Sequence, residues 1–173
     1  MKSIAVAVCA GVAALFVSVG AWAQSSGYTE AMRTQFLNEC RQGGSDVTLC
    51  QCIWNGVRAE YSLRQYSELN DAYRAQELHP NMVRQELILA ECRGDAPANG
   101  RYPAYTVQNF NTGCQGGGVS DAICSCMIDR LQQNVSFAEF VELDLMSAWG
   151  KDSEHGAYGR MVEAAQQCVA LNR

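Results

Sequence analysis

The residues whose types and spacing could do the most chemistry in this chain are cysteines. They form two sets, each with the pattern Cys-x9-Cys-x-Cys followed by one late cysteine. The sets comprise Cys40, Cys50, Cys52 and Cys92, and then Cys114, Cys124, Cys126 and Cys168. Such sulfurs can form structural disulfides, exchange with a substrate disulfide through Cys-x-Cys, or hold a soft metal ion such as Cu(I) or zinc.

Structural disulfides are the expected role of all eight cysteines. Cys50 and Cys52 stand two positions apart on an expected helix, so their side chains point about 200° apart and cannot bond to each other. Two schemes stay open in each set, because the first cysteine can bond to the second or to the third. We favour the scheme that pairs Cys40–Cys50, Cys52–Cys92, Cys114–Cys124 and Cys126–Cys168.

The two other roles fit the sequence less well. Zinc sites usually contain Cys-x2-Cys or added histidines, and the two histidines, His79 and His155, stand at non-equivalent places. We therefore expect no metal and no other cofactor. Thiol–disulfide exchange stays an alternative, because Cys50-Gln51-Cys52 lies in the first turns of an expected helix, where exchange enzymes present their cysteines.

The cysteine pattern belongs to an internal repeat with an offset of 74 residues. The repeat preserves residues expected at core, turn and cap positions, namely Phe36/Phe110, Gly43-Gly44/Gly117-Gly118, Ser62/Ser136 and Leu69/Leu143. It predicts two tandem homologous units, residues 24–93 and 104–173, each stapled by disulfides. Residues 94–103 between them are rich in glycine, proline and asparagine and are expected to form a linker.

The first two helices of each unit follow from apolar spacing. Residues 28–41 carry apolar residues at spacing four, and Gly43-Gly44 are expected to end this helix. Ser45-Asp46 then supply the cap of a second helix. Its apolar face is expected to comprise Cys50, Ile53, Trp54, Val57 and Tyr61, matched in the second unit by Cys124, Met127, Ile128, Leu131 and Val135.

Two further helices complete each unit, which gives an all-α fold with about four short helices per unit. Capping boxes at Ser62 and Ser136 begin the third helices. His79-Pro80 is expected to end the third helix of the first unit. The fourth helices are expected to bury Val83, Leu87, Ala90 and Cys92 in the first unit and Met161, Ala164, Ala165, Cys168 and Val169 in the second.

Residues 1–23 have the features of a secretory signal peptide. Lys2 precedes an apolar run at residues 4–19, and Ala21-Trp22-Ala23 forms a cleavage site. Cleavage after Ala23 leaves 150 of the 173 residues, eight of the nine cysteines and a net charge of −6. An even cysteine count in an exported chain indicates an oxidising compartment, so we expect a periplasmic or secreted bacterial protein.

Composition also limits the possible partners. No cluster of basic residues predicts binding to nucleic acid, and no second long apolar run predicts stable membrane insertion after signal cleavage. Catalytic motifs are sparse. His155 stands near Asp152 and Glu154, but a polar turn explains this cluster, and a hydrolase would need a histidine with a carboxylate partner in a cleft. We therefore expect no enzymatic activity.

The expected function is a non-enzymatic binding or accessory module, held together by four disulfides, that acts on an unknown protein or small ligand. A groove between the two units is its expected working surface. Trp149, next to Gly150 at a helix end, and Asp129 and Arg130, which differ from their counterparts in the first unit, are the candidate partner surface. The alternative is a periplasmic thiol–disulfide exchange or chaperone-type factor that uses Cys-x-Cys.

Overall fold

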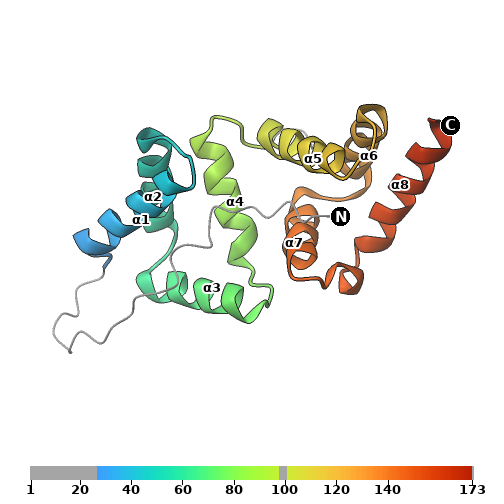
Figure 1. Cartoon of the computed structure of the whole chain (residues 1–173). Helices are drawn as coiled ribbons and strands as arrows, with labels where there is room; N and C mark the ends of the chain where they lie inside the picture. Colours follow the sequence, from blue (N-terminus) through green and yellow to red (C-terminus); the bar gives the residue numbers. More distant parts are fainter. Residues whose placement is uncertain (1–26, 98–100, 173) are drawn as a thin grey trace. The chain divides into compact units, whose positions relative to one another are not determined.

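The computed structural model describes residues 27–97 and 101–172 of the chain. In these residues all regular structure is helical, with eight α-helices and one short 3-10 helix (Figure 1). The predicted all-α fold is confirmed. None of the described helices is long and apolar enough to cross a membrane. The predicted signal peptide, residues 1–23, lies outside the described residues.

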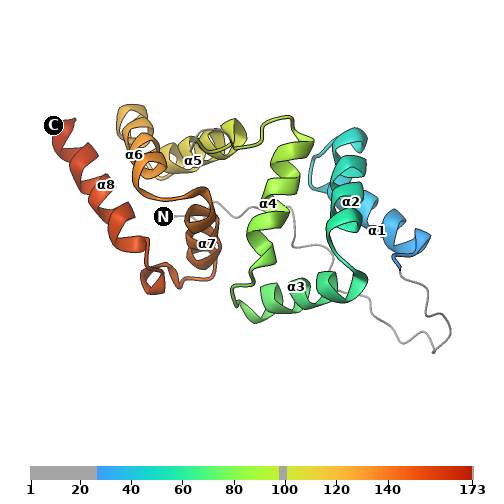
Figure 2. The same ribbon diagram turned by 180° about the vertical axis from the view of Figure 1, so that it is seen from behind.

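Among the described residues, four α-helices precede residue 100, and four α-helices and the 3-10 helix follow it (Figures 1 and 2). Before it lie α1 (Glu30–Gln42), α2 (Val47–Glu60), α3 (Leu63–Ala75) and α4 (Asn81–Cys92). After it lie α5 (Ala104–Gly116), α6 (Asp121–Asn134), α7 (Phe137–Ala148), η1 (Asp152–Glu154) and α8 (Tyr158–Leu171). The number and order of the α-helices therefore agree with four predicted helices on each side of the segment 94–103.

Contacts divide the chain into two compact units with a boundary between Asn81 and Met82. The N-terminal unit contains α1, α2 and α3, and the C-terminal unit contains α4 to α8. By its contacts α4 thus belongs with the helices that follow it, although the sequence repeat groups it with the helices before it.

In the N-terminal unit, α1 and α2 pack against each other around an aromatic cluster. Asp46 caps α2 through its carboxylate, which accepts hydrogen bonds from the backbone N–H groups of Thr48 and Leu49 at 2.8 and 2.9 Å. Trp54 of α2 is buried and meets the rings of Tyr28 and Phe36 at centroid distances of 5.2 and 5.4 Å. The whole predicted apolar face of α2 is buried, as expected: Cys50, Ile53, Trp54, Val57 and Tyr61.

The third helices begin as predicted, but α3 ends early. Both capping boxes form, at Ser62 with Gln65 and at Ser136 with Glu139. The prediction that His79-Pro80 ends α3 is wrong, because the helix stops at Ala75. Gln76 there adopts a left-handed conformation with φ 56°, and its N–H group bonds to the carbonyls of the last turn.

The core of the C-terminal unit gathers around Tyr102. This side chain is buried, and its ring lies 4.8 Å from that of Phe140 on α7. Its hydroxyl donates to the carbonyl of Val135 at the end of α6, at 2.7 Å. Tyr102 and the fully buried Pro103 belong to the segment predicted as linker, so the end of that segment is part of the core.

The predicted buried faces of the fourth helices are wrong in part. In α4, Val83 and Leu87 are only partly buried, whereas Met82, Ile88, Leu89 and Ala90 form the buried face. The apolar run from Leu87 to Ala90 covers a full turn, so spacing alone does not fix which side faces inward. In α8, Ala164 and Cys168 are buried as predicted, Met161 and Ala165 are partly buried, and Val169 is exposed near the helix end.

Candidate functional site

All eight cysteines from Cys40 to Cys168 are disulfide-bonded. The structure pairs Cys40–Cys50, Cys114–Cys124 and Cys126–Cys168, with Cα–Cα distances of 5.9, 5.9 and 5.8 Å. Cys52 and Cys92 are disulfide-bonded as well. The bonds Cys40–Cys50, Cys114–Cys124 and Cys126–Cys168 are among those favoured from the sequence.

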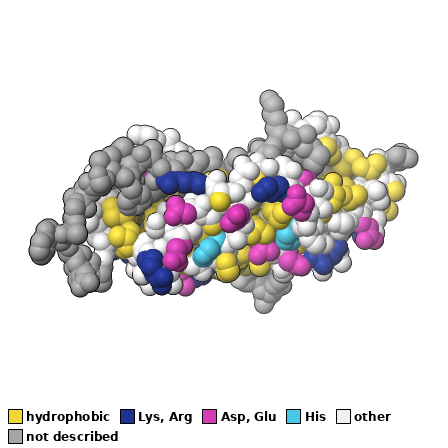
Figure 3. Space-filling model, turned by 90° about the horizontal axis from the view of Figure 1, so that it is seen from below, with side chains coloured by type: hydrophobic (Ala, Val, Ile, Leu, Met, Phe, Trp, Pro, Cys, Tyr) yellow, Lys and Arg dark blue, Asp and Glu magenta, His cyan; other side chains and the backbone are white. Residues whose placement is uncertain are grey.

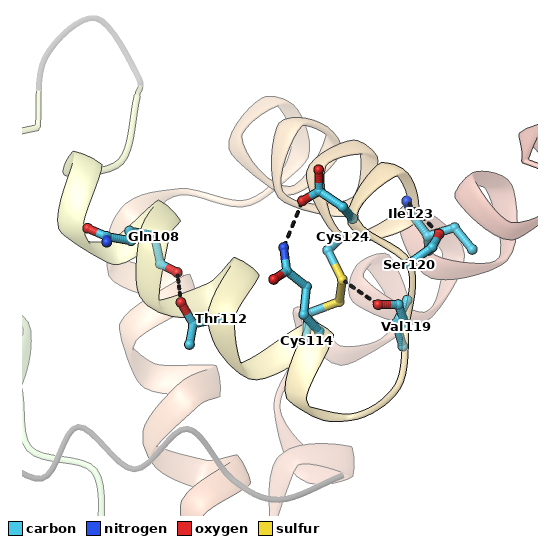
Figure 4. The surroundings of a disulfide bond; sticks show 9 residues. Gln108, Thr112, Cys114, Val119, Ser120, Ile123 and Cys124 are labelled. Carbon is cyan, nitrogen blue, oxygen red and sulfur yellow. Dashed lines mark hydrogen bonds between the residues drawn. A yellow bond between two sulfur atoms is a disulfide. The ribbon is translucent and has the colours of Figure 1, made fainter.

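The first disulfide of each set joins two helices across a short turn. Figure 4 shows how Cys114 near the end of α5 meets Cys124 in the first turn of α6. Ser120 caps α6 by accepting from the N–H of Ile123 at 3.4 Å. Gly118, with φ 83°, lets the backbone turn between the two cysteines. The bond and the turn together fix the position of α5 on α6.

Each Cys-x-Cys pair is divided between the core and the surface. Cys50 and Cys124 are fully buried, whereas Cys52 is exposed and Cys126 is partly exposed. This division follows from helix geometry, since residues two apart lie on opposite sides of a helix. Each sulfur of a pair therefore bonds to a different partner, and the pair offers no dithiol for catalysis in this state.

Two partly buried carboxyl groups lie on α4 and α7 of the C-terminal unit. Glu86 of α4 accepts a hydrogen bond from the hydroxyl of Tyr105 on α5 at 3.0 Å. Burial raises the pKa of Glu86, against the opposing effects of this hydrogen bond and of Arg93. Burial also raises the pKa of Asp144 on α7 to about 7, and the charge of Glu86 adds to the shift. Asp144 can therefore gain or lose a proton near neutral pH.

Arg93 and Asp95 connect this carboxyl cluster to the start of α5. The guanidinium of Arg93 lies 4.8 Å from the centre of the Tyr105 ring, a cation–π distance. A carboxylate oxygen of Asp95 accepts from the backbone N–H of Tyr105 at 3.1 Å. This bond caps α5, because its N-cap residue, Pro103, offers no side-chain acceptor.

Sequence reasoning did not single out Glu86, Tyr105 or Asp144. They come from three helices, and no local spacing brings them together. The one sequence signal is that Asp144, like Glu142, stands between apolar residues in the segment 141–146. A charged residue among buried apolar neighbours is uncommon enough to mark a position with a special environment.

His155 has the carboxylate partner that the sequence could not show. Its Nε2 lies 3.2 Å from a carboxylate oxygen of Glu142 on α7, and its side chain is only 11% exposed. Its Nδ1 accepts a hydrogen bond from the backbone N–H of Ala157 at 3.2 Å. In the neutral ring Nε2 is then the donor, so each ring nitrogen of His155 takes part in one contact.

The prediction that the two histidines stand at non-equivalent places is wrong. The Nδ1 atom of His79 accepts from the backbone N–H of Asn81, two residues on, at the same distance of 3.2 Å. His79 precedes α4 as His155 precedes α8, with an offset of 76 residues instead of 74. The offset between Cys92 and Cys168 is also 76.

The residues predicted to form a partner surface lie on α6 and at the end of α7. Asp129 is exposed on α6. The guanidinium of Arg130 bonds to the side-chain oxygen of Gln167 on α8, so it also holds these two helices together. Trp149 is the C-cap residue of α7, and its side chain is partly buried instead of fully exposed.

The remaining surface features are modest. An open depression at the turn between α1 and α2 is lined by Arg41, Asp46 and Val47, among others, and thus by charges of both signs and an apolar side chain. On the face drawn in Figure 3, Lys and Arg side chains lie apart from one another among acidic and apolar ones. Among the described residues, no group of three or more His, Cys, Asp or Glu side chains could hold a metal ion.

Comparisons with protein-family models, with curated proteins and with solved structures find no match to this chain.

Proposed function

We propose that this protein is an exported, non-enzymatic binding or accessory module of the bacterial periplasm or of the secreted fraction, built from two copies of one helical unit. One observation carries the proposal: every cysteine after the predicted signal peptide is disulfide-bonded. Four disulfides in a chain of this size are typical of an oxidising, extracytoplasmic environment. Their role in holding short helices together accounts for all eight sulfurs.

Equivalent contacts support the proposed duplication. The hydroxyl of Tyr28 donates to the carbonyl of Tyr61 at 3.2 Å, and 74 residues later that of Tyr102 donates to the carbonyl of Val135. The same offset relates the two short disulfides, and an offset of 76 relates the two histidine contacts. Shared hydrogen bonds at matched positions are expected when one folding unit is copied.

Thiol titration and intact mass test the proposal. Protein exported to the periplasm should lack residues 1–23 and, after denaturation without reductant, should contain no free thiol. Full-length chain in the membrane fraction, or a free Cys52 or Cys126 thiol in the exported protein, contradicts it. A mature chain with eight paired cysteines is the expected result.

The partner surface is tested separately. Alanine at Asp129 or Trp149 should leave helical circular dichroism nearly unchanged while weakening the retention of a partner from periplasmic extract. For the variant Arg130→Ala, stability must be measured as well, because the hydrogen bond between Arg130 and Gln167 joins α6 to α8. The control is Gln133→Ala, another exposed change on α6. Equal retention by all variants removes these residues from the proposed surface.

Thiol–disulfide exchange stays the second candidate, because Cys52 of Cys-x-Cys is exposed. An exchange enzyme turns over, so it should catalyse the reduction or reoxidation of a model disulfide substrate at catalytic concentration. Loss of such turnover in Cys52→Ser without loss of stability would replace the binding module by this second function.

A further inference from the structure

The Cys-x-Cys pair of α6 connects this helix to two different neighbours within the C-terminal unit. Cys124, in the first turn of α6, bonds to Cys114 of α5 (Figure 4). Cys126, two residues on, bonds to Cys168 of α8. Helix α6 packs against both α5 and α8, and residues two apart point about 200° apart on a helix. Once α6 has formed, each cysteine of the pair therefore faces only its own partner.

Before α6 forms, the chain does not distinguish these two cysteines. Cys124 follows Cys114 at a separation of 10 residues, and Cys126 stands only two positions further on. Because the entropy of closing a loop grows slowly with its length, Cys114 meets either sulfur almost equally often in the unfolded chain. The start of α6 makes the choice, since Ser120 caps the helix by accepting from the N–H of Ile123. Oxidation that precedes the helix therefore also produces a mispaired Cys114–Cys126 bond.

The mispaired chain contains the nucleophile that can correct it. In that chain Cys124 has no disulfide partner and stands two residues from the bond that must be opened, so exchange within the chain needs no second molecule. We infer that the Cys-x-Cys pair of α6 is an internal exchange pair for maturation, in which the Cys124 thiolate corrects a Cys114–Cys126 disulfide. In the folded unit Cys124 has no exposed surface, so folding shields its sulfur from renewed attack. The inference does not depend on the proposed binding function.

The correction has two steps. The thiolate of Cys124 bonds to Sγ of Cys114, the Cys114–Cys126 bond breaks, and Cys126 leaves as a thiolate that takes up a proton. This step leaves the number of disulfides unchanged and needs no oxidant. Cys126 and Cys168 are then oxidised by a disulfide reagent such as oxidised glutathione, which accepts two electrons and two protons and becomes two thiols.

Oxidative refolding of the mature chain, residues 24–173, tests the inference. The reduced, unfolded chain is briefly oxidised with oxidised glutathione, quenched in acid and freed of glutathione. After its return to mildly alkaline buffer, free thiols are alkylated with iodoacetamide at increasing times. Digestion before Asp121 separates Cys114 from the pair, and fragment mass spectra show which cysteine of the pair carries the label. At the start, the bonds from Cys114 to Cys124 and to Cys126 should be present within about twofold of each other.

Without any redox reagent, the Cys114–Cys126 bond should then decay at the rate at which Cys114–Cys124 appears, and Cys126 should become the free thiol. This rate should not depend on protein concentration, because the attack is internal. Three results overturn the inference: a mispaired bond that is absent at the start or persists, a rate that rises with protein concentration, and formation of Cys126–Cys168 with a free Cys114 thiol. The last result assigns the attack to Cys168.

Two kinds of variant add further measurements. Cys168→Ala should keep the exchange and end with a free Cys126 thiol, and loss of the exchange in this variant overturns the inference. Ser120→Ala should leave about fivefold more Cys114–Cys126 bond at equilibrium, because it removes the cap that starts α6. Ser125→Ala, between the two cysteines and not at a cap, is the matched control. Equal fractions of mispaired bond in the two serine variants overturn the inference that formation of α6 selects Cys124.

Discussion

Tyr102 donates its hydroxyl hydrogen to the carbonyl of Val135 at 2.7 Å and so ties the segment before α5 to the end of α6. The Val135 N–H bonds to Leu131, so the helix end is held on both sides of this residue. Burial raises the pKa of Tyr102, which keeps the phenol in its neutral, donating form at all physiological pH values. Tyr28 makes the equivalent bond to Tyr61 at 3.2 Å, but its side chain is less buried.

The first prediction compares these two tyrosines. Tyr102→Phe should lower the free energy of unfolding by about 1–3 kcal/mol, because it leaves a buried carbonyl without its donor. Tyr28→Phe should cost less, since water can reach its half-buried site. Urea titration of both variants measures the difference. An equal or larger loss for Tyr28→Phe contradicts the assigned burial.

The second prediction concerns pH and Asp144. Burial raises the pKa of this carboxyl from 3.8 to about 7 in the folded protein. A raised pKa means that the folded state holds the proton more tightly, so the stability from this group is complete below about pH 4 and is lost as the pH rises through about 7. Asp144→Asn mimics the protonated form.

Asp144→Asn should therefore match the wild type near pH 4 and exceed its free energy of unfolding by about 1–3 kcal/mol at pH 8. Glu86→Gln should shift stability in the same direction, because burial raises the pKa of Glu86 too. Asp129→Asn, at an exposed site on α6, is the control. Wild-type stability that does not fall between pH 4 and pH 8 contradicts the assigned environment of Asp144.

Much of the fold follows from local sequence signals. Capping residues at Asp46, Ser62 and Ser136 fix where helices begin, since a side-chain acceptor in this place satisfies an otherwise unbonded N–H group. Helix geometry excludes a bond between Cys50 and Cys52, because their side chains cannot face the same way, and it leaves two pairing schemes in each set.

The features that sequence reasoning missed depend on contacts between distant residues. Gln76 takes a left-handed conformation although it is not a glycine. The sequence therefore does not predict that α3 ends at Ala75. The contact between Tyr105 and Glu86 needs two helices to be packed before it exists. The matching contacts of His79 and His155 lie 76 residues apart, so a fixed offset of 74 does not align them.

The third prediction concerns His155. His155→Ala should lower the free energy of unfolding by about 1 kcal/mol, since the N–H of Ala157 at the start of α8 loses its acceptor. His155→Asn should recover most of this loss, because an asparagine side-chain oxygen can accept the same hydrogen. Thermal unfolding of the three proteins checks the order. Equal stability of the alanine and asparagine variants indicates that the contact with Glu142 is the one that matters.

The last prediction compares two disulfides of the C-terminal unit. The bonds Cys126–Cys168 and Cys114–Cys124 span sequence separations of 42 and 10 residues. A cross-link restricts the unfolded chain more when it closes a longer loop, so removing the first should cost about 4 kcal/mol and removing the second about 3 kcal/mol. Both bonds contain one fully buried cysteine, so paired alanine variants lose similar packing in each case.

In urea unfolding without reductant, the free energy of unfolding of Cys126→Ala/Cys168→Ala should therefore be lower than that of Cys114→Ala/Cys124→Ala by about 1 kcal/mol. The short disulfide fixes one turn, whereas the long one holds α8 against α6, so the first variant should also lose the protection of α8 amides from hydrogen exchange. If the short disulfide proves the more costly to remove, the turn between α5 and α6 is the critical element, and restriction of the unfolded chain does not set the order.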